Sequence, residues 1–325
     1  MIMVTGATGL LGSHLVDALV ARGEHVRALV QPGEDSARLT AQGVEVRYGD
    51  LRNPPSLAQA TEGVDLVLHC GAKTGPWGDP REYEAINVRG LEALTRAAMA
   101  AGVRRLVHVS SITVHGNDVG GVADESAPFH EEPNPYTRTK IAGERLLQRL
   151  IQQEGARVTI VRPGWIYGPR DTASFGRFAE MVRRGGMVVI GSGHNHIPLI
   201  YVTDVAQGIL RAAEAPGALG QAYLLVNDER VTQLAYLSLM AKAQGAPVPR
   251  RHIPYRLALL AGTTGETVGK TLRWQSPPPL MRYGLQMLGG ENQFVITKAR
   301  TQLGFRPTVP AEEGVRRGIE WLKQR

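Results

Sequence analysis

The amino-acid sequence predicts an α/β fold, with a doubly wound parallel sheet followed by a smaller, irregular C-terminal region. Short β-branched runs alternate with longer helical patterns through the first half of the chain, which is typical of strand–helix–strand units. After Arg162 this alternation ends, glycine and proline become denser, and runs such as Pro277–Pro279 interrupt any regular element. A length of 325 residues suits two domains of roughly 150 residues each. We expect one domain over residues 1–162 and a second region over 163–325.

The elements of the first half follow from its apolar runs. The expected strands are Met1–Thr5, His25–Val30, Val44–Tyr48, Leu66–His69, Leu106–Ser110 and Val158–Arg162. The expected helices are Leu11–Arg22, Ser56–Thr61, Glu82–Ala101 and Tyr136–Glu154. A glycine stands just beyond each helix, where a left-handed residue commonly ends it. Four repeats of this pattern predict parallel strands joined by helices.

The second half offers fewer signals. Tyr201–Val205 is typical of a strand that enters a helix, so the segment 196–215 is expected to return to the main sheet. The last helices are expected to begin near Thr297 and Ala311.

Composition narrows the class of protein. The chain is 43% apolar and 21% charged, which suits an ordinary globular protein. No apolar run reaches the roughly 18 residues of a membrane span, and the first residues lack a basic signal-peptide region, so we expect a cytoplasmic protein without a membrane partner. The single cysteine, Cys70, excludes internal disulfides, and we interpret it as core packing. The net charge of +7 is scattered, so no nucleic acid is expected and a small anionic ligand suffices.

A glycine-rich loop lies directly between the first strand and the first helix. Gly6, Gly9 and Gly12 are spaced so that backbone N–H groups and the positive helix end can approach a pyrophosphate, and Gly12 lets the helix pack on the strand. This context predicts a dinucleotide cofactor on a Rossmann sheet. The expected contacts in the loop are Gly6, Thr8, Gly9, Leu10 and Leu11.

The identity of the dinucleotide rests on the ends of the next two strands. Gln31 can hydrogen-bond a ribose hydroxyl but cannot neutralise a 2′-phosphate, which favours NAD, whereas arginines near it in sequence leave NADP open. Asp50 and Leu51 follow the third strand, where the carboxylate can meet the adenine amino group. The alternative for Asp50 is a helix N-cap region.

A catalytic set is suggested by spacing and position. Tyr136 and Lys140 lie four apart on one expected helix, so their side chains share a face, and a neighbouring ammonium favours the phenolate. Ser111 follows the fifth strand, at the edge where parallel sheets bind ligands, and can hydrogen-bond a substrate oxygen. Ser110 is interpreted as a strand-end cap, and Thr113 stays open as a second donor. This chemistry suits proton exchange with a secondary alcohol or ketone during hydride transfer.

The full motif set resembles the extended short-chain dehydrogenase/reductase superfamily over nearly the whole chain. Its parts are Thr5-Gly-x-x-Gly-x-x-Gly12, Asp50-Leu51, Asn87-Val88-x-Gly90, Ser110-Ser111, Tyr136-x-x-x-Lys140 and Arg162-Pro163-x-x-x-Tyr167-Gly168-Pro169. The resemblance implies that Ser111, Tyr136 and Lys140 form a catalytic triad, with Lys140 also on the nicotinamide ribose. It further implies cofactor or supporting roles for Gly71, Ala72, Lys73, Asn87, Pro163 and Ile166. It also suggests a homodimer built on the two long helices.

Two stretches resemble the 3β-hydroxysteroid dehydrogenase family and its bacterial relatives, which include 2-alkyl-3-ketoalkanoate reductases. They are His69–Gly78 and the C-terminal run from Met281 to Pro307. Nucleotide-sugar epimerases share the catalytic set, but many carry a diphosphate-binding arginine where this chain has Ile197. His115 replaces a common tyrosine and is interpreted as either a substrate contact or a packed loop residue.

Other candidate features have ordinary alternatives. His194 and His196 lack an acidic or cysteine partner in sequence, so no metal is expected. Four aromatic side chains can form an apolar substrate wall or fill the space between the domains. They are Trp77, Trp165, Tyr167 and Phe175.

The favoured function is an NAD(P)-dependent oxidoreductase that interconverts a secondary alcohol and a ketone on a largely apolar substrate, either 3β-hydroxysteroid-like or a β-hydroxy/β-keto compound. One alternative is a nucleotide-sugar 4-epimerase or dehydratase that retains NAD. The other is a dinucleotide-sensing protein without chemistry, against which the presence of both Tyr136 and Lys140 argues.

Overall fold

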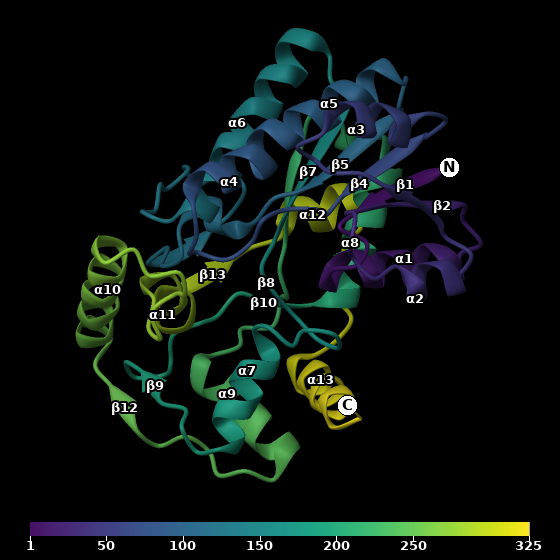
Figure 1. Ribbon diagram of the computed structural model, residues 1–325. Helices are drawn as coiled ribbons and strands as arrows, with labels where there is room; N and C mark the ends of the chain where they lie inside the picture. Colours follow the sequence, from purple (N-terminus) through teal and green to yellow (C-terminus); the bar gives the residue numbers. More distant parts are fainter. Residues whose placement is uncertain (325) are drawn as a thin grey trace.

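A seven-stranded parallel sheet forms the centre of the molecule in the computed structural model, which describes residues 1–324 (Figure 1). The strands stand in the order β11-β7-β5-β4-β1-β2-β3, so the chain winds outward in both directions from β1 and β4. Their bounds are β1 Ile2–Thr5, β2 Val26–Val30, β3 Glu45–Tyr48, β4 Leu66–His69, β5 Arg105–Val109, β7 Val158–Pro163 and β11 Ala222–Leu225. The six strands expected from the sequence are all present, within a residue or two at each end.

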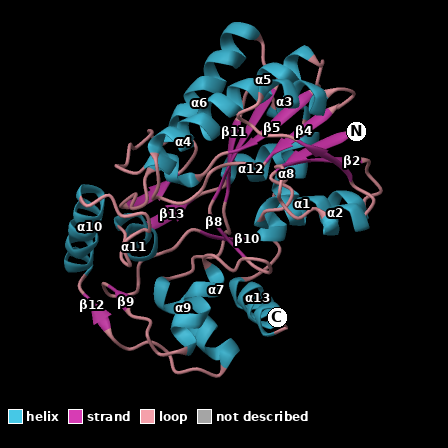
Figure 2. Ribbon diagram, in the orientation of Figure 1, coloured by secondary structure: helices cyan, strands magenta, loops and turns pink. Residues whose placement is uncertain are grey.

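Helices cover both faces of this sheet (Figures 1 and 2). One face carries α1 (Leu10–Ala21), α2 (Ala37–Ala41), α8 (Val202–Glu214) and α12 (Thr297–Leu303), and the other carries α3 (Pro54–Thr61), α5 (Leu91–Ala100) and α6 (Pro135–Glu154). Alternate strand residues enter the two cores, as Met3 and Val4 of β1 show. Both layers are therefore apolar, as a doubly wound sheet requires.

The expected helix over Glu82–Ala101 is divided into three parts. These are α4 (Pro80–Glu84), a π-helical segment η1 (Ala85–Gly90) and α5. Such wide turns are frequent at functional sites because they shift a side chain out of the ordinary helical register. Here the shifted segment carries Asn87.

The C-terminal region contains more helix than its irregular sequence suggested. Its core is formed by α7 (Phe175–Arg183), α9 (Gln233–Gln244) and α13 (Ala311–Lys323), while α10 (Tyr255–Thr271) and α11 (Arg282–Gly289) lie at one side (Figure 2). Three two-stranded ladders complete this region. Two lie within it, β8 (Trp165–Tyr167) with β10 (Leu199–Tyr201) and β9 (Val189–Ile190) with β12 (His252–Ile253), and the third, β6 (Gly121–Ala123) with β13 (Asn292–Phe294), joins it to the first half of the chain. Two short 3-10 turns complete the elements, η2 (Ile112–His115) and η3 (Pro216–Ala218). The starts expected near Thr297 and Ala311 are confirmed.

The returning segment differs from the expectation. Its helix α8 packs on the main sheet, but its strand β10 pairs with β8, and the strand that joins the main sheet is β11, beyond residue 215. Gly164 explains the difference. Its N–H donates to Leu225 of β11, while the N–H of Trp165 donates to Pro198 before β10. One extended segment thus changes partner at Gly164.

In the described part of the chain, no helix is both long and apolar enough to cross a membrane.

Candidate active site

The glycine loop is packed directly against the segment that follows β4. Gly6 adopts a φ of +67°, and a Cβ on it would lie 2.8 Å from the backbone nitrogen of Gly71. A Cβ on Gly12 would lie 2.1 Å from the carbonyl oxygen of Gly6. Because these neighbours are backbone atoms, only glycine fits at both positions. Leu10 and Leu11 begin α1 directly above this turn.

The N-terminus of α1 fits the phosphates of a dinucleotide. Its N-cap, Gly9, is extended and offers no side-chain cap, and among the described residues of the first turn none is acidic. The first N–H groups and the positive helix end are therefore suited to an anion. The hydroxyl of Thr8 donates to Glu34 at 2.9 Å, which brings a carboxylate from the loop after β2 to the glycine loop. The residues present thus fit the predicted cofactor.

The arginines near the expected adenosine end all have local partners. Arg27 is buried and donates to the carbonyl oxygens of Ala60 and Glu62, and Arg38 pairs with Asp17 at 2.6 Å. Arg52 pairs with Asp50 at 2.5 Å and lowers the pKa of that carboxyl group. The N-cap residue of α3 is Asn53, and Asp50 lies in the turn before it, where its carboxylate accepts the N–H of Arg52 at 2.8 Å, so the alternative of an N-cap region stays open. Gln31 follows β2, and Leu51 is buried against Gly90 of η1.

Asn87 joins two segments of the site. Its Oδ1 accepts from the N–H of Lys73 at 2.8 Å, and its Nδ2 donates to the carbonyl oxygen of Lys73 at 2.9 Å and to Thr139 Oγ1 at 3.0 Å. The loop that contains Gly71, Ala72 and Lys73 is thereby attached to α6, one residue before Lys140. The supporting role implied for Asn87 thus operates through backbone and Thr139 contacts. The Lys73 ammonium itself pairs with Glu82.

Helix α6 places Tyr136 and Lys140 one turn apart at the carboxyl edge of the sheet. The helix begins at Pro135, with Asn134 capping the N–H of Thr137 at 2.9 Å. The Lys140 ammonium donates to the carbonyl oxygen of Val109 at 2.8 Å and lies 5.8 Å from the centre of the Tyr136 ring. Ser111, two residues after Val109, hydrogen-bonds Tyr136 through its hydroxyl. The three predicted catalytic residues are therefore brought together.

The electrostatics of this set depend mainly on burial. Burial raises the pKa of Tyr136 to about 12, opposed by its hydrogen bond with Ser111. Burial lowers the pKa of Lys140 to about 8, opposed by the charge of Glu144. The pKa of Tyr136 is thus raised and not lowered in net, because desolvation outweighs the hydrogen bond with Ser111, while the Lys140 ammonium donates to Val109.

A buried ionic network lies beneath the catalytic helix, and the sequence reasoning missed its two main residues. Glu144 and Arg162 pair at 2.6 Å with almost no solvent exposure. Ser110 donates to Glu144 at 2.5 Å, so it is not a strand-end cap. His115 Nε2 lies 3.0 Å from Arg162 Nη1, and the ring packs near Phe129 and Phe294. His115 is therefore a packed loop residue. Two sequence signals were available: Glu144 stands four residues after Lys140, and Arg162 is a charge within an apolar strand.

The buried side chains of His69 and Cys70, near Lys140, are neutral at pH 7. His69 hydrogen-bonds Thr5 at 2.7 Å, and its ring centre lies 5.3 Å from that of His108, with the two rings tilted by 33°. Burial lowers the pKa of His69 to about 3. Burial also raises the pKa of Cys70 to about 12, which agrees with its interpretation as packing. Thr113 Oγ1 is buried without a hydrogen-bond partner in the described structure, so its role stays open.

The remaining candidate residues lie in the C-terminal core or at its edge. Tyr167 and Phe175 are fully buried there, so they fill the core and do not line a substrate wall, while Trp165 contacts Phe178 at 5.2 Å between ring centres. Pro163 ends β7, and Ile166 lies half-buried in β8. Ile197 is buried in the same core, where it cannot bind a diphosphate.

The two histidines of the His-x-His pattern do not act together. His196 pairs with Glu291 at 2.8 Å, whereas His194 takes part through its backbone N–H, which donates to Ser192. Among the described residues, no group of three His, Cys, Asp or Glu side chains is placed to hold a metal ion.

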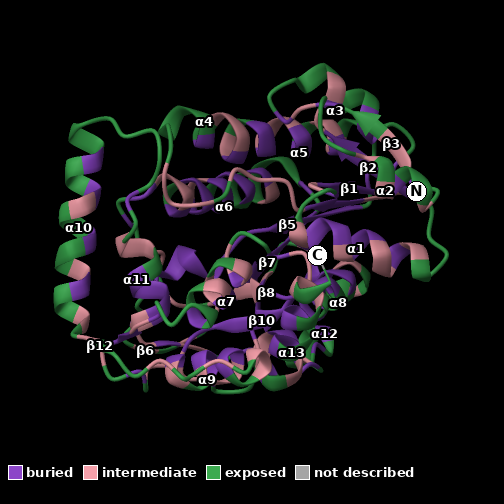
Figure 3. Cartoon of the chain, turned by 60° about the horizontal axis from the view of Figure 1, so that its bottom comes forward, coloured by how far each residue is buried: buried purple, intermediate pink, exposed green. Residues whose placement is uncertain are grey.

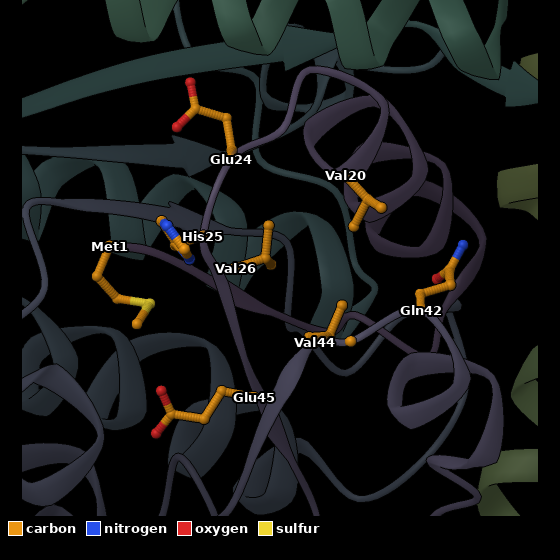
Figure 4. Close-up of a pocket in the computed structure, with 9 residues that line it drawn as sticks. Met1, Val20, Glu24, His25, Val26, Gln42, Val44 and Glu45 are labelled. Carbon is orange, nitrogen blue, oxygen red and sulfur yellow. The ribbon is translucent and has the colours of Figure 1, made fainter.

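A surface hollow lies at the opposite end of the strands from this site (Figure 4). Met1, His25 and Val44, which line it, immediately precede β1, β2 and β3. No predicted site residue lines it, so we assign it no role.

Comparison with known proteins adds family information to this geometry. Residues 2–225 match the NAD dependent epimerase/dehydratase family. The chain is 34% identical to the 2-alkyl-3-oxoalkanoate reductase of Stenotrophomonas maltophilia (strain K279a) over 97% of both chains. It is 30% identical to the decarboxylating sterol-4-alpha-carboxylate 3-dehydrogenase of Mus musculus, over 98% of this chain and 89% of that one. The UDP-glucuronic acid 4-epimerase of Bacillus cereus, solved with NAD, has a TM-score of 0.79 at 23% identity, covering 99% of this chain and 98% of that one, and shows the fold alone.

Proposed function

The chain belongs to the NAD-dependent epimerase/dehydratase family and is an oxidoreductase of the extended short-chain dehydrogenase/reductase type, and we propose that it interconverts a secondary alcohol and a ketone on a largely apolar substrate. The observation that carries this proposal is the grouping of Ser111, Tyr136 and Lys140 beside the glycine loop, at one edge of the sheet. Relatives that are named reductases and dehydrogenases support the reaction class.

The chain's own residues divide the chemistry between them. The nicotinamide, when bound, supplies or accepts the hydride. Tyr136 donates a proton to the ketone oxygen in reduction, because its phenol is fully protonated at neutral pH with a pKa of about 12. Ser111 orients the same oxygen through its hydroxyl, and the Lys140 ammonium stabilises the phenolate that forms. The oxidation of an alcohol uses the same groups in reverse.

An apolar substrate is favoured over a nucleotide sugar. Ile197 is buried in the C-terminal core, where many sugar-nucleotide enzymes carry an arginine. Tyr283 lies edge-on to Tyr136, with ring centres 6.4 Å apart, and places an aromatic side chain next to the reacting group. The name of the Stenotrophomonas relative suggests a β-keto acid with an alkyl branch as the first substrate class to test.

NAD is preferred to NADP in this proposal. Glu34 is held beside the glycine loop by Thr8, and a carboxylate there repels a 2′-phosphate. Gln31 adds no positive charge, and Arg27, Arg38 and Arg52 are engaged with other groups. The homodimer and the cytoplasmic location suggested by the sequence are retained as proposals.

The test is an activity comparison with purified full-length enzyme. Consumption of NADH with a 2-alkyl-3-ketoacid or a 3-ketosteroid, with one hydroxy product per NADH oxidised, is the expected result. Isomerisation of a UDP-sugar without net cofactor turnover would overturn the proposal in favour of the epimerase alternative. Titration of NAD and NADP, with wild type and Glu34→Gln, tests the cofactor preference. Binding of NADP is expected to improve in the variant.

A further inference from the structure

Helix α10 and the segment after it expose large apolar side chains to solvent. Of the eleven large apolar side chains exposed in residues 1–324, six lie between 257 and 280, with exposures of 41% to 64%. We call these six residues the α10 surface: Leu257, Leu260, Val268, Leu272, Trp274 and Leu280. The usual surface helix buries its bulky residues and exposes its polar ones. Three of the six lie in α10 and three in the segment after it, and all six depart from that pattern.

The inner face of α10 combines Tyr255 and Leu259, which pack against the C-terminal core, with small residues. Gly262 faces Leu285 of α11, and Gly269 faces Trp77, where an added Cβ would lie 2.7 Å and 3.0 Å from the nearest side-chain atom. Leu257, Leu260 and Val268 stand three and eight residues apart, on the outer side of the same helix. Figure 3 shows α10 at the edge of the molecule with exposed residues along its length. The helix is therefore closely attached to the protein while Leu257, Leu260 and Val268 face outward.

The charges in the segment that carries this surface are mainly basic. The segment 248–284 contains six basic residues and one acid: Arg250, Arg251, Arg256, Lys270, Arg273, Arg282 and Glu266. Glu266 is buried and accepts the N–H of Arg282 at 2.6 Å, and Asp118 accepts from the hydroxyl of Tyr255 at 2.6 Å. These carboxylates reduce the positive charge of the segment but leave it in excess. Apolar side chains with a basic rim and an exposed tryptophan are the composition of an interfacial helix.

We propose that the α10 surface docks the enzyme onto an anionic lipid bilayer, with Leu257, Leu260, Leu272 and Trp274 entering the headgroup boundary. A second copy of the chain is a poorer occupant, because a two-fold contact would bring the same basic residues against each other. A helix lying on a bilayer does not need the roughly 20 apolar residues of a spanning one. The expectation of no membrane partner rested on span length and does not bear on this mode of binding.

The α10 surface lies close to the candidate active site. Trp77 of the loop after β4 donates to the carbonyl oxygen of Trp274, and Lys270 donates to that of Pro133, before α6. Docking would deliver a lipid-dissolved substrate to Tyr136. Only this delivery depends on the proposed function. The docking itself rests on exposure and charge, so its test needs no substrate.

The experiment is sedimentation of the full-length protein with sucrose-loaded vesicles. The vesicles consist of phosphatidylcholine alone or of phosphatidylcholine with about 30% phosphatidylglycerol, an anionic lipid. Wild type is expected to partition onto the anionic vesicles and to be released by high salt. Leu260→Ser/Leu272→Ser and Arg256→Gln/Arg273→Gln should each weaken the partition at least about fivefold. The matched controls, Val122→Ser/Met181→Ser and Arg104→Gln/Arg184→Gln, alter exposed residues elsewhere and should bind like wild type.

Three results would overturn the proposal. The first is the absence of binding to anionic vesicles, and the second is an equal loss of binding in the control variants. The third is a concentration-dependent dimer in sedimentation velocity that only the α10 variants abolish, without vesicle binding, which would assign the surface to a second copy. Far-ultraviolet circular dichroism of each variant verifies folding, which is expected to be retained because every altered residue is exposed or half-buried.

Discussion

The glycine loop and helix α10 use glycine in different ways. In the sheet, Gly6 and Gly12 let one backbone segment approach another, so a methyl group would meet atoms that cannot move. In α10, Gly262 and Gly269 face the side chains of Leu285 and Trp77. A side chain can relieve a steric clash by changing rotamer, whereas a backbone turn can relieve it only by losing its conformation. The backbone arrangement of the glycine loop is therefore fixed, whereas the shortest contacts of Gly262 and Gly269 are with side chains that can adjust.

The largest expected effect is the difference in kcat between variants of Tyr136 and Tyr283, whose rings are in contact at the site. Tyr136→Phe removes the proton donor and should lower kcat for ketone reduction by about 10²- to 10⁴-fold. Tyr283→Phe keeps the edge-on ring contact and should change kcat by less than about tenfold. Steady-state NADH oxidation on the same ketone measures both. Equal losses would show that the C-terminal region contributes directly to proton transfer.

The next effect concerns stability. Glu144→Gln leaves the buried Arg162 without its counter-charge and should lower the free energy of unfolding by about 3–5 kcal/mol. The double variant Glu144→Leu/Arg162→Met, which removes both charges, should recover much of that loss. In the C-terminal region, Glu313→Gln alters an exposed network and should leave stability nearly unchanged. Urea unfolding measures all three, and a stable Glu144→Gln protein would contradict the network's importance.

The glycine contrast is tested by one methyl group on each side. Gly12→Ala places a Cβ 2.1 Å from a carbonyl oxygen and should lower stability by about 1–3 kcal/mol and weaken NAD binding. Gly262→Ala meets Leu285 at 2.7 Å and should cost less, since alanine gains up to about 1 kcal/mol of helix propensity. Thermal unfolding and NAD titration check both. A larger loss for Gly262→Ala would reverse the comparison.

The smallest effect is the response to pH. The pKa of Lys140 is lowered from 10.5 to about 8, so its ammonium is lost as the pH rises through 8 and the rate of ketone reduction should fall. Between pH 8 and 10.5 the unfolded lysine still binds a proton that the folded one has released, so this group makes stability rise with pH in that window. Lys140→Met should abolish that rise and should be more stable than wild type at pH 7. Rate profiles and unfolding at several pH values measure it, and a flat rate profile up to pH 10 would contradict the assignment.

The sequence was most informative where local rules decide the structure. The strand–helix repeats predicted six of the seven strands, and the spacing of Tyr136 and Lys140 predicted their shared face. The seventh strand, β11, has four residues and no alternating pattern, so only its pairing with β7 identifies it. The tyrosine pKa could not be predicted because it depends on burial by segments distant in sequence. The exposed apolar side chains of α10 were not predicted, because apolar periodicity does not reveal which face of a helix is covered.

The change of partner at Gly164 has a consequence for how the chain acquires its structure. The outer edge of β7 is completed only by β11, about 60 residues further along the chain. A growing polypeptide released after residue 162 would present a bare edge strand, open to pairing with a neighbour. The order of the strands in the sheet therefore differs from the order in which they are synthesised. The sheet is complete only after residue 225 has been made, so the residues between β7 and β11 must leave the sheet and return to it before its edge is covered.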